Sequence, residues 1–84
     1  MQAQKLLEKA LNRPQNLRFA EALKLAQAFG FQMARTRGSH YLLKRPGVPE
    51  LLNFQNAGGK AKPYQIKQMM EIVETYNLSL GRLK

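Results

Sequence analysis

The sequence predicts a small α+β domain with two layers, in which a three-stranded antiparallel sheet has its helices on one face, in the order α-α-β-β-β-α. Three observations predict this fold. Apolar residues recur at helical spacing over residues 3–11, 17–29 and 63–76. Between residues 31 and 55 apolar and polar residues alternate instead, which is typical of strands with one buried face. Turns that contain Gly or Pro separate the alternating segments.

The chain of 84 residues is long enough for one domain. We expect the core of that domain to span residues 17–78. Residues 1–16 form an extra N-terminal helix and a linker, because Pro14 interrupts the first helical pattern. This short helix is expected to dock on the others, since isolated helices of that length are marginal in water. Residues 79–84 are expected to form a frayed basic tail.

The composition favours a polyanionic partner. Fourteen Lys and Arg residues against five Glu residues give a formal net charge of +9, which is typical of a nucleic-acid-binding domain. An acidic protein partner would also fit this charge. The sequence contains no cysteine, no signal-peptide pattern and no apolar run of the ~20 residues that span a bilayer, so we expect a cytoplasmic protein. One histidine and five dispersed carboxylates predict no metal site, and we expect no cofactor.

His40 is the only histidine, and it follows a basic turn. A three-residue loop at residues 37–39 would pair Thr36 with His40. His40 and Leu42 would then lie on the face of the sheet that the helices leave open. A two-residue loop is the alternative, and a slip of one residue moves a whole strand to the other face. We expect the three-residue loop, because it buries the better apolar set: Phe31, Met33, Tyr41 and Leu43. A second turn at residues 46–49 then leads into a third strand over residues 51–55.

Several cations could hold RNA phosphates near this histidine. Arg35, Arg37 and Lys44 lie close to His40 in the sequence. Lys60 and Lys62 follow Gly58-Gly59 and precede a predicted helix start at Pro63, where charge and free N–H groups can bind a phosphate. An ordinary solvated loop explains these two lysines equally well. The remaining cations of the first two helical segments are expected to be solvated surface: Lys5, Lys9, Arg13 and Arg18.

The segment Gly38-Ser39-His40-Tyr41-Leu42-Leu43, after a helix that ends in Phe29-Gly30-Phe31, resembles the HicA toxin family of type II toxin–antitoxin systems. The resemblance extends from Leu17 to the segment 63–78. It implies a double-stranded-RNA-binding-like fold and a ribosome-independent endoribonuclease (an mRNA interferase) with a role in the stress response. It also implies that His40 is catalytic and that a HicB antitoxin neutralises the protein.

Two features depart from the family pattern. Many members have a further histidine near the end of the third strand, where this chain has Gln55-Asn56. The helix over residues 3–11 is an addition to the minimal pattern. The first departure leaves the second proton-transfer group open between water, Tyr41 and Ser39.

Cleavage of RNA without a metal requires a group that takes the 2′-hydroxyl proton and cations that stabilise the charge on the phosphorane. We therefore expect His40 to act as general acid or base. Around it, six residues are expected to bind RNA: Arg35, Arg37, Ser39, Lys44, Lys60 and Lys62. A non-catalytic double-stranded-RNA-binding module is the alternative, and an interaction domain for an acidic protein is the third interpretation.

Overall fold

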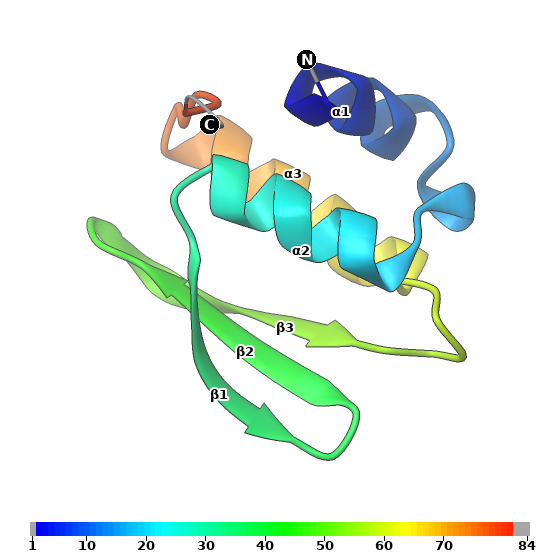
Figure 1. Ribbon diagram of the computed structural model, residues 1–84. Coiled ribbons are helices and arrows are strands. Elements are labelled where there is room, and N and C mark those ends of the chain that lie inside the picture. Colours follow the sequence, from blue (N-terminus) through cyan, green and yellow to red (C-terminus); the bar gives the residue numbers. More distant parts are fainter. Residues whose placement is uncertain (1, 82–84) are drawn as a thin grey trace.

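A computed structural model describes residues 2–81 of the chain (Figure 1). The elements follow one another as α1 (Gln2–Asn12), the short 3-10 helix η1 (Pro14–Asn16), α2 (Phe19–Ala28), β1 (Gln32–Arg37), β2 (His40–Arg45), β3 (Val48–Gln55) and α3 (Pro63–Thr75). The predicted α+β class and the predicted order of three helices and three antiparallel strands are confirmed. None of the helices in residues 2–81 is both long and apolar enough to cross a membrane.

The sheet has the strand order β1-β2-β3, with β2 in the centre. Helices α2 and α3 cover one face of the sheet, and α1 lies on the side of these two helices that faces away from the strands (Figure 1). The ion pair between Lys9 and Glu21, 2.9 Å long, ties α1 to α2. The other face of the sheet carries no helix, and we call it the open face.

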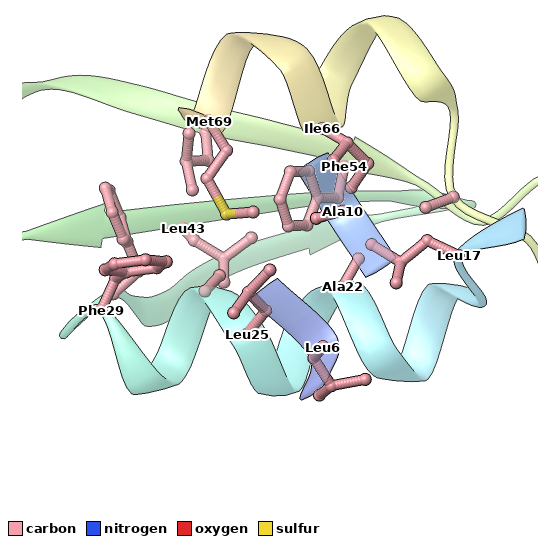
Figure 2. Packing of buried hydrophobic residues seen from close by; sticks show 14 of the residues in the cluster. Leu6, Ala10, Leu17, Ala22, Leu25, Phe29, Leu43, Phe54, Ile66 and Met69 are labelled. Carbon is pink, nitrogen blue, oxygen red and sulfur yellow. The ribbon is translucent and has the colours of Figure 1, made fainter. Parts of the chain in front are cut away.

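A single apolar cluster lies between the sheet and the helices. Figure 2 shows Leu43 and Phe54 from the strands together with Leu25 and Met69 from the helices. These four side chains are all at most 1% exposed, so the apolar side of each helix and strand is buried against those of its neighbours. Leu6 and Ala10 of α1 join the same cluster from the outer side, which explains why the short first helix is held.

Local signals set the ends of α2 and α3. Gly30 has φ +96° and donates its N–H to the carbonyl of Gln27, as expected for a glycine just after a helix. Pro63 is the first residue of α3, where a missing N–H costs nothing. Asn77 follows α3 with φ +52°, a left-handed conformation that asparagine tolerates better than most residues.

The predicted register of the first hairpin is wrong. The turn contains two residues, Gly38 and Ser39, and Arg37 pairs directly with His40, while Thr36 pairs with Tyr41 on the helix-facing side. The register shifts between Met33 and Arg35, so one extra residue, Ala34, forms a β-bulge. Because the bulge restores the alignment further along the strands, Met33 still pairs with the buried Leu43. The predicted burial of Met33 is nevertheless wrong, since its side chain lies on an edge strand and is 40% exposed.

The third strand is longer than predicted. β3 begins at Val48 rather than at Leu51, and the second turn contains only Pro46 and Gly47. Pro49 is tolerated because β3 is an edge strand, where a missing N–H need not break a ladder. The predicted inward face is confirmed, since Leu52 and Phe54 are each 1% exposed.

The chain after α3 turns back over the helices. Leu78 and Leu80 are half-buried against the core, and the N–H of Gly81 donates to the carbonyl of Ala28 at 2.6 Å. The first residues of the predicted tail therefore lie against the end of α2. Residues 82–84 of that tail lie outside the described residues.

Candidate nucleic-acid interface around His40

His40 is the first residue of the central strand, and its side chain lies on the open face. Tyr41 and Leu43 point to the helices, so strand alternation places His40 and Leu42 on the other side. Arg37 of β1 and Gln55 of β3 are its direct cross-strand neighbours. Because β2 has a strand on each side, the exposed imidazole has polar neighbours on both flanks.

The bulge at Ala34 brings two arginines to the face that carries His40. Arg37 pairs with His40, and Arg35 pairs with Leu42, so both arginines share the open face with these partners. Strict alternation from Phe31 would have placed Arg35 on the opposite face. Both arginine side chains are exposed, which leaves their guanidinium groups accessible to an anion.

Asn53 contacts the imidazole directly. Its side-chain oxygen Oδ1 lies 3.3 Å from Nδ1 of His40, from a position diagonally opposite on β3. An oxygen acceptor at this distance favours the tautomer that carries its proton on Nδ1. The second ring nitrogen, Nε2, then has a lone pair that can accept a proton.

Two residues from the sequence analysis are separated from His40. Lys44 pairs with Gln32 at the far end of β2, about 13 Å along the strand from His40 at the usual rise per residue. Tyr41 lies on the helix side, where its ring packs against Phe19 with a centroid separation of 4.7 Å. The phenol of Tyr41 is therefore on the wrong face to exchange a proton with a group bound at His40.

The loop over residues 56–62 begins beside the His40 turn. The N–H of Asn56 donates to the carbonyl of Ser39 at 2.9 Å, which continues the pairing of β2 with β3. Asn56 also accepts the N–H of Gly59 through its side-chain oxygen at 2.7 Å. Lys60 is exposed at the end of this loop, and Lys62 is half-buried as the residue that precedes α3. The structure thus brings both predicted lysines to the end of the sheet that carries His40.

Sequence reasoning assigned no role to three polar residues at this end of the sheet. Asn53 and Gln55 alternate with two buried residues of β3, so strand periodicity could have placed them beside His40 once the pairing was known. Gln65 is a buried polar residue of α3, only 3% exposed. Its spacing to Met69 and Ile72 places it on the buried side of the helix, which was the available signal.

The side chain of Gln65 fixes the end of β3. Its Oε1 accepts the backbone N–H of Gln55 at 2.7 Å, and its Nε2 lies 3.3 Å from the hydroxyl of Tyr64. Gln55 is on the free edge of the sheet, so this N–H would otherwise have no strand partner. Within residues 2–81, the structure brings no group of three or more His, Cys, Asp or Glu side chains together.

Fold and site together define a small basic α+β protein in which a histidine and two arginines share the uncovered face of a three-stranded sheet. Residues 19–74 match the family model described as the HicA toxin of bacterial toxin–antitoxin systems. This match covers more than half of the chain, and the protein therefore belongs to the HicA toxin family. Comparisons with curated proteins and with solved structures found no match. Membership gives the protein the role of a toxin and implies an antitoxin partner and an RNA target in general terms.

Proposed function

We propose that this HicA-family toxin is a cytoplasmic, metal-independent endoribonuclease that cleaves mRNA with His40 as its general acid or base. The observation that carries the proposal is the position of His40. It lies on the open face of the sheet, directly across from Arg37, with Nδ1 next to Asn53. An RNA strand could reach this face without any rearrangement of the helices, because they cover the opposite face (Figure 1).

The chemistry follows from the arrangement of the side chains. With its Nδ1 proton directed to Asn53, His40 can accept the proton of a 2′-hydroxyl at Nε2. The 2′-oxygen then attacks the adjacent phosphorus, and the bond from phosphorus to the 5′-oxygen breaks. Arg37 and Arg35 share the open face with His40 and are proposed to stabilise the negative charge of the phosphorane. Ser39 or water supplies the proton for the leaving 5′-oxygen.

The substrate-binding surface extends beyond these residues. Lys60 and Lys62 lie at the same end of the sheet and are proposed to bind backbone phosphates together with Ser39. Lys44 is too far along β2 to contact the reacting phosphate and is proposed to contact RNA outside the cleavage site. Phosphate contacts of this kind position a nucleic acid and do not read its sequence.

Cleavage assays test the catalytic role. Wild-type protein, His40→Ala and Gln32→Ala are incubated with one RNA, with the same RNA carrying 2′-O-methyl groups, and with DNA of matched sequence, all in EDTA. We expect the wild type and Gln32→Ala, a control at the far end of the open face, to cleave only the unmodified RNA. His40→Ala should be slower by about 10²–10⁴-fold.

Equal cleavage by His40→Ala and the wild type would remove His40 from catalysis. Binding without cleavage by the wild type would favour a double-stranded-RNA-binding module instead.

A HicB-like antitoxin is proposed to neutralise the toxin by covering the open face. Leu42 is a half-buried apolar residue next to His40 and two arginines, a combination that suits an acidic partner with an apolar contact. Addition of the antitoxin should stop RNA cleavage and slow hydrogen exchange in β1 and β2. Inhibition that leaves exchange in both strands unchanged would contradict a covered face.

A further inference from the structure

A second pair of cations is held together outside the sheet. Residues 17–19 and 59–61 form a short antiparallel bridge with two backbone hydrogen bonds. The N–H of Phe19 donates to the carbonyl of Gly59 at 3.0 Å, and the N–H of Ala61 donates to the carbonyl of Leu17 at 3.1 Å. Arg18 and Lys60 are directly opposite each other in this bridge. Their side chains therefore leave the backbone on the same side, with Cβ atoms about 5 Å apart. Both residues are exposed.

This pairing is electrostatically unfavourable in the free protein. Like charges directly opposite each other in an antiparallel pair reduce stability. The nearby carboxylate is that of Glu21, which accepts hydrogen bonds from the backbone N–H of Arg18 at 3.0 Å and from Lys9 at 2.9 Å. This single carboxylate interacts with the charges of both Lys9 and Arg18, so it does not offset the further positive charge that Lys60 brings to the bridge. A bound anion would relieve this repulsion.

The cation pair is connected to the His40 site through the backbone. Gln55 pairs with His40, Asn56 donates to Ser39, and Ala57 bridges Lys60. Figure 1 shows the start of α2, the loop over residues 56–62 and the β1–β2 turn at the same end of the molecule. Arg37, Lys60 and Arg18 therefore belong to segments that meet at this end of the molecule.

We propose that Arg18 and Lys60 bind a backbone phosphate of the RNA substrate, a short distance along the strand from the phosphate at His40. The proposal rests on the proposed endoribonuclease function and adds Arg18 to the substrate-binding surface. Two separate groups of cations at one end of the molecule, Arg37 beside His40 and the pair of Arg18 and Lys60, suit a polymer that carries a negative charge at each of its units. An acidic protein segment is the other possible class of ligand, and the experiment separates the two.

RNA binding is measured in the His40→Ala background, so that the RNA stays intact. Fluorescence anisotropy with a labelled single-stranded RNA is recorded over a series of salt concentrations for four added substitutions: Arg18→Gln, Lys60→Gln, Arg18→Lys and Lys5→Gln. Lys5→Gln removes the same charge from the exposed surface of α1 and is the matched control. Binding of poly-L-glutamate is measured with the same proteins, and unfolding in urea is followed for each of them.

Arg18→Gln and Lys60→Gln should each weaken RNA binding several-fold relative to Lys5→Gln and reduce the slope of log K against log salt by about 0.7. Arg18→Lys should retain RNA affinity within about twofold. Lys60→Gln should not be less stable than the Lys5→Gln control, since it removes a repulsion, whereas Arg18→Gln also removes an attraction to Glu21. RNA affinities of both Gln variants equal to the control would overturn the inference. Loss of poly-L-glutamate binding alone would also overturn it, by assigning the pair to an acidic protein. The proposed catalytic function is tested independently by the cleavage assay, and it is wrong if the wild-type protein does not cleave RNA.

Discussion

The buried side chain of Gln65 accepts the backbone N–H of Gln55 at 2.7 Å, and Gln55 is the residue directly across from His40. This bond joins α3 to the free edge of the sheet at the end where the His40 site lies. Helix α3 therefore holds the residue of β3 that lies across from His40. The geometry of His40 depends on how firmly the last residue of β3 is held.

Replacing Gln65 with Leu should loosen this end of β3. The apolar side chain removes the acceptor and leaves the N–H of Gln55 without a partner, so the free energy of unfolding should fall by about 1–3 kcal/mol. The amide of Gln55 should also exchange with solvent faster, as measured by NMR. Gln68→Leu changes an exposed residue of the same helix and is the control. Unchanged protection of the Gln55 amide in Gln65→Leu would show that another group holds the strand.

The fold was predictable because the spacing of apolar residues within each segment distinguishes a helix from a strand. The helical spacing of Ile66 and Met69 and the alternation that places Leu52 and Phe54 on one side identify which side of each element is buried, and all four residues are buried. The open face of His40 was predictable for the same reason, since the alternation of β2 is local. The extra residue Ala34 was not predictable, because the β-bulge depends on how β1 packs against its neighbours.

The pairings at the edges of the site could not be predicted from the sequence, for a different reason. Arg18 and Lys60 are far apart along the chain, and their pairing requires α2, β3 and α3 to be in place. The sequence pattern therefore assigned Arg18 to solvated surface. The contact of Asn53 with His40 likewise depends on the register between β2 and β3. The alternation of apolar and polar residues in two strands does not by itself define which residues pair.

Changing Asn53 should alter catalysis more than folding. Asn53→Ala removes the oxygen that accepts from Nδ1 of His40, so kcat for RNA cleavage should fall by about tenfold with little change in KM. Asn53→Asp places a carboxylate beside the ring, which favours the imidazolium form and should move the acidic limb of the pH–rate profile to higher pH. Gln32→Asp adds the same charge at the far end of the open face as a control. Identical pH–rate profiles for the two Asp variants would argue against a direct effect of residue 53.

Gly30→Ala should destabilise the junction between α2 and β1. The backbone there has φ +96°, and a Cβ atom would lie 2.8 Å from Nε of Arg45, which is held by a hydrogen bond to the carbonyl of Phe29. We expect a loss of about 2 kcal/mol in the free energy of unfolding, measured in urea. Gly58→Ala also introduces a side chain at positive φ, but in open space, and should cost about half as much. Equal losses for both variants would show that Arg45 moves aside freely.

Glu21 should make the stability of the protein depend on pH. The pKa of this carboxyl group is lowered below 4.5, mainly by the hydrogen bond from the backbone N–H of Arg18 and next by that from Lys9. A carboxylate with a lowered folded-state pKa contributes stability above its unfolded-state pKa and loses that contribution as the pH falls through the folded-state value. Glu21→Gln should therefore be less stable than the wild type at pH 7, by about 0.5–1 kcal/mol because the pair is partly exposed to solvent.

The difference between Glu21→Gln and the wild type should shrink as the pH falls below 4.5, because the protonated Glu21 of the wild type then resembles the amide. Urea unfolding at pH 7, 5, 4 and 3 measures this convergence. Glu8→Gln removes the same charge from an exposed position on α1 and shows how much of the effect arises from net charge alone. A difference that stays constant down to pH 3 would mean that Glu21 stabilises the junction of α1 and α2 through packing of its side chain and not through its charge.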